Sequence, residues 1–110
     1  MRDVNAEIDQ LVKSNPVVLF MKGTSSFPMC GFSARTLEIL KACGLGPNQF
    51  KSVNVLEDAD IREGVKIYGQ WPTIPQLYVS GQLIGGCDIA MEMFQSGELA
   101  PLIQSAIAAG

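Results

Sequence analysis

Cys30 is the residue of this sequence best placed to do chemistry. It follows an apolar run and a loop, and Gly31-Phe32-Ser33 continues into an expected helix. The free amide N–H groups and the positive dipole end of a helix stabilise an anion, so a thiol at such a position ionises more readily. Lys22 can add a second favourable charge. The alternative is a buried structural cysteine with Lys22 as a solvated strand end, and position alone does not separate the two.

Ser33 limits what the Cys30 thiol could do. In a Cys-x-x-Cys redox motif, the second thiol attacks the mixed disulfide and closes a ring. Here the second position is serine, so Cys30 can form a mixed disulfide with a small thiol but cannot resolve it within its own motif. The Ser33 hydroxyl is also expected to cap the helix.

The composition of the chain narrows the chemistry further. It has three cysteines and no histidine, which excludes imidazole bases, Cys-His nucleophile pairs and His-ligated metals. An all-cysteine tetrahedral metal site needs one more thiolate than one subunit has, and the odd count argues against a disulfide scaffold. A net charge of −3 and a pI near 4.7 give no electrostatic basis for non-specific nucleic-acid binding.

Length and hydropathy limit the architecture and the location. A chain of 110 residues with 47% hydrophobic residues is expected to form one domain, spanning residues 1–110, around a real core. The longest apolar run, 17–21, is far too short to span a membrane, so no membrane partner is expected. Residues 1–7 contain no secretory h-region and no Arg-rich leader. We therefore expect a cytoplasmic protein, most simply a bacterial one, with an organelle still open if a leader has been removed.

Apolar periodicity and turn residues predict the elements that must position Cys30. The first half of the chain is expected to contain a helix from residue 4 that ends at Asn15-Pro16, a strand at 17–21, a helix from about 30–33 to Gly44 and a strand at 50–55. A helix capped by Asp58 follows, and then two strands at 76–80 and 82–85 that are joined at Ser80-Gly81. The chain is expected to finish with a helix at 89–95 opened by Asp88 and a short last helix from Leu99 with Pro101 in its first turn.

This order of elements predicts the fold class. A helix joins the first two strands, so these strands should be parallel with a right-handed crossover, whereas the last two form an antiparallel hairpin. The expected structure is an α/β protein with a mixed four-stranded sheet flanked by helices on both faces, which is the thioredoxin-like arrangement.

Four short motifs then point to one family. They are Lys22-Gly23-Thr24, Pro28-Met29-Cys30-Gly31-Phe32-Ser33, Trp71-Pro72-Thr73-Ile74-Pro75-Gln76 and Gly85-Gly86-Cys87-Asp88. In order and spacing they resemble the CGFS-type monothiol glutaredoxins, and the match runs from about Asn15 to Leu102. Each motif is weak alone, but the four together are highly specific.

The resemblance implies a glutathione site beside Cys30. In this family, glutathione is also an extra ligand of a [2Fe–2S] cluster that bridges two subunits. Cys30 and one glutathione thiolate from each subunit would supply the four sulfur ligands that such a cluster needs, so Cys30 is the expected metal ligand as well as the catalytic thiol. The implied partners are glutathione, a second copy of the chain in a cluster-bound homodimer, BolA-type proteins and apo iron–sulfur proteins.

By the same resemblance, Gly86, Cys87 and Asp88 would hold the γ-glutamyl end of glutathione. Glycine lets the backbone approach a ligand closely, and backbone amides at a helix start bind carboxylates. The Asp88 carboxylate would bind the ammonium group. From the sequence alone Asp88 is expected to be a helix N-cap, and one residue can do both.

The resemblance also assigns residues to the rest of the ligand. Ile74-Pro75 resembles the cis-proline turn of the fold, which would direct the Ile74 backbone toward the cysteinyl amide of glutathione, while a plain strand-start proline is the alternative. Phe32 and Thr73 are expected beside the ligand.

The glycyl carboxylate of glutathione is the last group to be assigned. Lys22 and Arg62 would bind it, with Lys66 as a weaker candidate. Without the resemblance, Arg62 would be read as a solvated helix residue.

The other cysteines and aromatic residues have structural interpretations. Cys87 could be a second thiol that reaches Cys30, but a structural role at a tight helix start is favoured, and Cys43 is expected to be a core thiol. Trp71 and Phe32 would form an exposed apolar rim around Cys30, although each could equally belong to the core.

Two main functions follow. The first is an iron–sulfur cluster carrier, and the second is a glutathione-dependent oxidoreductase that removes glutathione from protein thiols through Cys30. The loop at 24–28 should separate them, because it is longer than the approach found in dithiol glutaredoxins and could shift the glutathione sulfur toward iron. An adaptor that binds BolA-type proteins through a shared cluster would add to the first function.

Overall fold

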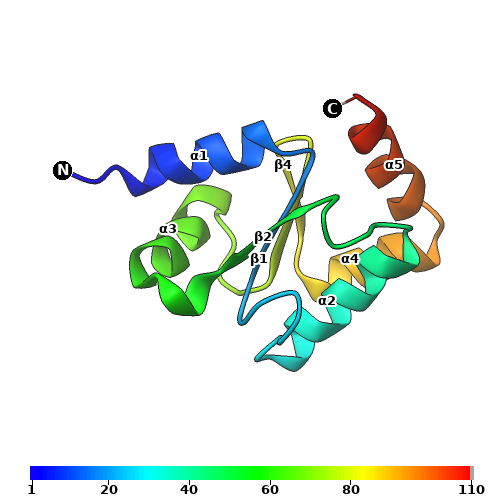
Figure 1. Ribbon diagram of the computed structural model, residues 1–110, viewed down its shortest axis with the longest axis horizontal. Coiled ribbons are helices and arrows are strands. Elements are labelled where there is room, and N and C mark those ends of the chain that lie inside the picture. The colour runs from blue at the N-terminus through cyan, green and yellow to red at the C-terminus, as the bar shows by residue number, and fades with distance from the viewer. Residues whose placement is uncertain (110) are drawn as a thin grey trace.

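A mixed four-stranded sheet lies between two layers of helices in the computed structural model, which describes residues 1–109 (Figure 1). The strands are β1 (Val17–Met21), β2 (Lys51–Asn54), β3 (Gln76–Val79) and β4 (Gln82–Gly85). The helices are α1 (Val4–Ser14), α2 (Gly31–Ala42), α3 (Ala59–Gly69), α4 (Cys87–Gln95) and α5 (Leu99–Ala109), with a 3-10 turn η1 (Val55–Glu57). Within residues 1–109, no helix has the length and apolar character needed to cross a membrane.

The strand order in the sheet is β2-β1-β3-β4. β1 pairs in parallel with β2 through the α2 crossover, and antiparallel with β3, which forms a hairpin with β4. Ser80 and Gly81 both have positive φ, of 52° and 78°, as the expected two-residue turn requires. The predicted mixed sheet and its connections are therefore confirmed.

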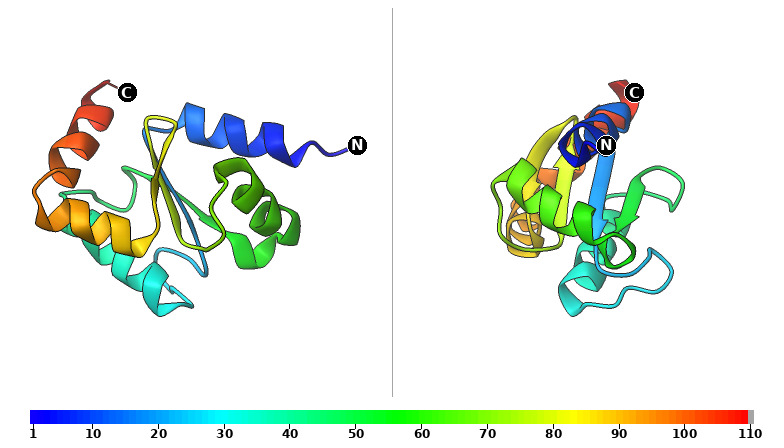
Figure 2. Two further views of the ribbon diagram at one scale, coloured as in Figure 1. Left: turned by 180° about the vertical axis from the view of Figure 1, so that it is seen from behind. Right: turned by 90° about the vertical axis from the view of Figure 1, so that its left-hand side faces the viewer.

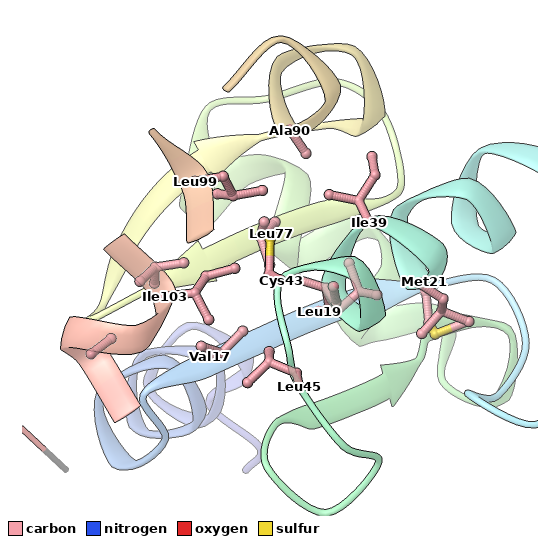
Figure 3. Close-up of a cluster of buried hydrophobic side chains, with 14 residues drawn as sticks. Val17, Leu19, Met21, Ile39, Cys43, Leu45, Leu77, Ala90, Leu99 and Ile103 are labelled. Carbon is pink, nitrogen blue, oxygen red and sulfur yellow. The ribbon is translucent and has the colours of Figure 1, made fainter. Parts of the chain in front are cut away.

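β1 lies at the centre of the protein and is buried on both faces, as its continuous apolar run predicts. Val17, Leu19 and Met21 face α2, α4 and α5, where Cys43 also points its sulfur into the apolar cluster (Figure 3). Val18 and Phe20 face the opposite cluster, under α1 and α3. Because successive strand residues alternate between faces, this one strand joins both cores.

Several predicted bounds and one predicted length are wrong. β2 stops at Asn54 rather than at residue 55, because the Asn54 side chain accepts the Leu56 N–H and starts η1. Gly86, not Asp88, is the N-cap of α4, so this helix begins two residues earlier than predicted. The last helix is 11 residues long rather than short.

Other predicted boundaries are confirmed. Asp58 caps α3, with its side chain accepting from the N–H groups of Asp60 and Ile61. Pro101 lies in the first turn of α5, where it removes no helical hydrogen bond. Cys30 immediately precedes α2, so it lies in the connection from β1 to α2, which Figure 2 shows at one end of the sheet.

Candidate functional site

A cleft of about 470 Å³ opens beside Cys30. Every residue that the sequence analysis expects to contact glutathione lines it: Lys22, Cys30, Phe32, Arg62, Thr73, Ile74, Pro75, Gly86, Cys87 and Asp88. The lining is completed by Lys66, Trp71, Pro72 and Ile89. Segments far apart in the sequence therefore meet in one concave site.

Cys30 is the N-cap of α2, and its thiol is free and partly exposed. Burial raises the pKa of this thiol, but the nearby N–H groups of Ser33 and Phe32, the Ser33 hydroxyl and the charge of Lys22 lower the pKa overall. The thiolate is thus stabilised while it remains in reach of solvent. This environment favours the reactive interpretation of Cys30 over the structural one.

Ser33 does not cap the helix as predicted, because Cys30 already occupies the N-cap position and Ser33 lies inside the first turn. Its side chain is fully buried. The hydroxyl oxygen instead accepts the backbone N–H of Lys22 at 3.1 Å. Ser33 therefore ties the end of β1 to the start of α2 and also contributes to the lowered pKa of Cys30.

The loop between β1 and Cys30 is held by hydrogen bonds between its own backbone groups. Thr24 and Phe27 exchange backbone hydrogen bonds, and the Met29 N–H donates to the Lys22 carbonyl at 2.9 Å. Gly23 adopts φ +96°, and a Cβ there would run into the backbone of Phe27 and Met29. This conformation and the close approach both require glycine.

Asn54 anchors this loop to the rest of the protein. Its Oδ1 atom accepts the Gly23 N–H at 2.9 Å and the Leu56 N–H at 3.0 Å. One side-chain oxygen thus holds the start of the loop against η1. The one signal in the sequence was a polar residue near the end of an expected strand, and this signal does not show which backbone groups Asn54 contacts.

The segment 71–75 forms another wall of the cleft. The Ile74-Pro75 peptide bond is cis, as the resemblance implied. Ile74 is 7% exposed, and its N–H donates to no acceptor within residues 1–109. The buried indole Nε1 of Trp71 likewise has no partner in that part of the chain. The buried indole N–H carries a free-energy cost while it lacks an acceptor. A ligand with acceptor groups could pair with N–H groups of this wall that lack one.

The N-terminus of α4 faces the same cleft. Gly86 is its N-cap and provides no side chain to satisfy the first N–H groups of the helix. Asp88, in the first turn, is exposed. Free amides with a carboxylate beside them can bind a carboxylate and an ammonium group at neighbouring positions, as in an α-amino acid.

Positive side chains reach the cleft from other elements. Lys22 follows β1 and Arg62 projects from α3, and within residues 1–109 neither pairs with a carboxylate. Lys66 pairs with Glu63 at 3.2 Å. Because α3 and α4 lie on opposite faces of the sheet, Arg62 and Asp88 enter the cleft from different sides (Figure 1).

The remaining cysteines differ from Cys30. Cys43 is 5% exposed within the apolar cluster, and burial raises the pKa of its thiol, so the predicted core thiol is confirmed. Cys87 is free and buried at the start of α4 while lining the cleft, which agrees with the favoured structural interpretation. Phe32 is 56% exposed beside Cys30, as expected of an apolar rim.

Two further residues shape the site and were missed by sequence reasoning. Gln76 and Tyr78 are buried in β3, behind the 71–75 wall. A glutamine at a buried strand position was the available signal, because such a side chain needs hydrogen-bond partners in the interior.

Comparisons with family models and with known proteins agree on one family. The glutaredoxin family model matches residues 17–84. "Monothiol glutaredoxin-5, mitochondrial" from Lachancea kluyveri is 57% identical over 99 residues, covering 90% of this chain and 69% of that protein.

Two solved structures are also similar over most of the chain. Reduced poplar apo GrxS14 has a TM-score of 0.80 at 47% identity, covering 96% of this chain and 94% of that one. A buckwheat glutaredoxin–glutathione complex has a TM-score of 0.80 at 26% identity, covering 94% and 89%. With its thioredoxin-like fold and a serine in place of the second thiol, the chain belongs to the glutaredoxin family, among the monothiol glutaredoxins.

Proposed function

We propose that this protein binds glutathione in the cleft beside Cys30 and, as a pair of subunits, holds and transfers a [2Fe–2S] cluster. One observation carries the proposal: a stabilised thiol shares a cleft with unpaired cations, free helix amides and an unpaired backbone N–H. Glutathione has a carboxylate at each end, an ammonium group, peptide carbonyls and a thiol. Each of these groups has a counterpart in the cleft.

Different residues of the cleft would bind different groups of glutathione. Lys22 and Arg62 would bind the glycyl carboxylate, since both lack a partner of opposite charge within residues 1–109. The amides of Cys87 and Asp88 would bind the γ-glutamyl carboxylate, and the Asp88 side chain the ammonium group. The Ile74 N–H would donate to the cysteinyl backbone. The complex formed by the similar buckwheat glutaredoxin supports glutathione as the ligand.

The ligand count favours a cluster shared between subunits. Within residues 1–109, no three Cys, Asp or Glu side chains are grouped so that they could hold a metal ion. Cys30 of each subunit supplies one thiolate, and bound glutathione would supply the other two sulfur ligands. The cluster would be cargo, passed on to apo iron–sulfur proteins, with BolA-type proteins as further partners.

A second candidate function is removal of glutathione from protein thiols. The observation that favours it is that Cys30 combines a lowered pKa with partial exposure, as an attacking thiol requires. The closed loop before Cys30, held by Asn54, is the feature that would favour the carrier function over this activity.

The compartment is part of the proposal. We expect the cytoplasm, while the relative named as mitochondrial keeps an organelle open as the location. Cluster transfer is compatible with either, because both maintain thiols in the reduced state that Cys30 and glutathione require.

Anaerobic reconstitution with iron, sulfide and glutathione tests the proposal, read by visible absorption and native mass. We expect a coloured dimer with two irons and two glutathiones. Cys30→Ser should abolish the colour and the glutathione mixed disulfide, whereas the matched change Cys43→Ser, in the core, should leave both largely intact. A cluster assembled on Cys30→Ser would overturn the ligand assignment. A colourless monomer that turns over a glutathione mixed disulfide would establish the second function instead.

A further inference from the structure

Gln76 is fully buried at the start of β3, immediately behind the wall of the cleft. We propose that Gln76 is a positioning residue for the ligand: it fixes the Thr73–Ile74 peptide group so that the Ile74 N–H is presented to the cleft. This inference rests on the proposed function, because it assigns the acceptor of that N–H to glutathione.

The contacts of Gln76 use both ends of its amide. Its Nε2 group donates to the Trp71 carbonyl at 3.0 Å and, at a longer 3.4 Å, to the Thr73 carbonyl. Its Oε1 atom accepts the Tyr78 hydroxyl at 2.9 Å. One buried side chain therefore holds two carbonyl groups of the 71–75 wall from behind.

The geometry of the peptide group carries this restraint into the cleft. The C=O and N–H of a planar trans peptide point in opposite directions. The Thr73 carbonyl is turned toward Gln76, so the Ile74 N–H of the same peptide group is turned away from it. That N–H has no acceptor within residues 1–109, and Ile74 lines the cleft. Gln76 thus sets the direction of a donor that it does not touch.

Tyr78 fixes which way the Gln76 amide faces. Carbonyl oxygens only accept hydrogen bonds, so the Gln76 NH₂ group must face them, and the Tyr78 hydroxyl must donate to Oε1. Burial raises the pKa of Tyr78 to about 12, with a smaller contribution from the charge of Tyr68, so the hydroxyl keeps its proton at neutral pH. A Cβ at position 69 would collide with this hydroxyl, so the glycine there leaves room for the Tyr78 hydroxyl behind the amide.

A purely structural role would not require this arrangement. Leu77 and Val79 of the same strand are held by apolar packing, and burying an amide incurs a desolvation cost that hydrogen bonds only offset. What the amide adds over an apolar side chain is the fixed orientation of the wall.

Titration with reduced glutathione tests the inference, followed by ¹⁵N amide shifts of the full chain. Gln76→Met removes both donors, and Gln76→Glu keeps the side-chain shape if the first variant does not fold. Gln104→Met is the control for loss of a glutamine donor away from the cleft, since the exposed Gln104 donates to the Cys43 carbonyl at 2.8 Å, between α5 and the end of α2.

We expect the wild type to bind with a shift of the Ile74 amide. Loss of one oriented hydrogen bond predicts about tenfold weaker binding by Gln76→Met, and loss of the Ile74 shift. Gln104→Met should bind within about twofold of wild type, even where it unfolds more easily. Wild-type binding with an unaltered Gln76→Met would overturn this inference alone. A wild type that binds no glutathione would overturn the proposed function itself.

Discussion

The backbone N–H of Lys22 donates to the buried hydroxyl of Ser33 at 3.1 Å, which joins the last residue before the loop to the first turn of α2. This contact holds the hydroxyl beside Cys30, where it helps to lower the pKa of the thiol. The serine that replaces a resolving cysteine is therefore a structural and electrostatic part of the site.

Ser33→Ala should raise the pKa of Cys30, because a hydroxyl that favours the thiolate is lost while the burial that disfavours the thiolate remains. The thiolate fraction at neutral pH falls, so alkylation by iodoacetamide should be slower and its pH midpoint higher. Thr36→Val is the control, since it also removes a buried hydroxyl of α2, one that bonds to the Phe32 carbonyl. Equal pH profiles for Ser33→Ala and wild type would contradict the assignment.

Asp88→Ala should weaken glutathione binding about tenfold, through loss of a charge-assisted contact with the ammonium group. The free energy of unfolding should hardly change, because Asp88 is exposed and Gly86 is the N-cap. Calorimetric titration and urea unfolding of the same preparation separate these effects. The reverse result, a destabilised protein with normal binding, would make Asp88 a structural residue only.

Asn54→Ala should loosen the loop before Cys30. It leaves the N–H groups of Gly23 and Leu56 without their acceptor, which costs on the order of 1–3 kcal/mol of folding free energy. Hydrogen exchange at these two amides should become faster. Asn54→Asp keeps an oxygen at the same position and should preserve slow exchange. If Asn54→Ala exchanges no faster than wild type, the loop is held by its own hydrogen bonds.

Asp58 should contribute stability that depends on pH. Its carboxylate accepts hydrogen bonds from Arg2 and from the Ile61 N–H, and these lower its pKa in the folded state. The stabilisation is therefore present above the unfolded pKa, about 3.9, and is lost as the pH falls through the folded value. Arg2→Ala should reduce stability at pH 7 but not at pH 2, as measured by urea unfolding. Salt should weaken the effect, because both side chains are partly exposed.

The sequence was sufficient for the central parts of the fold. The apolar run of β1 predicts a strand buried on both faces, and Ser80-Gly81 predicts the hairpin. The end of β2 and the start of α4 could not be predicted, since each depends on one local feature. The Asn54 side chain accepts the N–H of Leu56, two residues further along the chain. Gly86 begins a helix without a capping side chain.

The lining of the cleft was predictable because its residues occur in short motifs, which the fold brings together. The residues behind the lining were not. Asn54 and Gln76 act on backbone groups that become their neighbours only after folding, and neither hydrophobic periodicity nor the motif that ends at Gln76 shows which groups these are. Single polar residues at strand positions were the one signal available.

Gly23 makes the loop before Cys30 hard to change by mutation. Any side chain at this position meets two independent obstacles, an unfavourable φ of +96° and the backbone atoms of Phe27 and Met29. A second substitution can shrink a neighbouring side chain, but it cannot remove backbone atoms or change the handedness of an L-residue. A second substitution at a neighbouring position therefore relieves neither obstacle, and we expect variants at Gly23 to be hard to rescue.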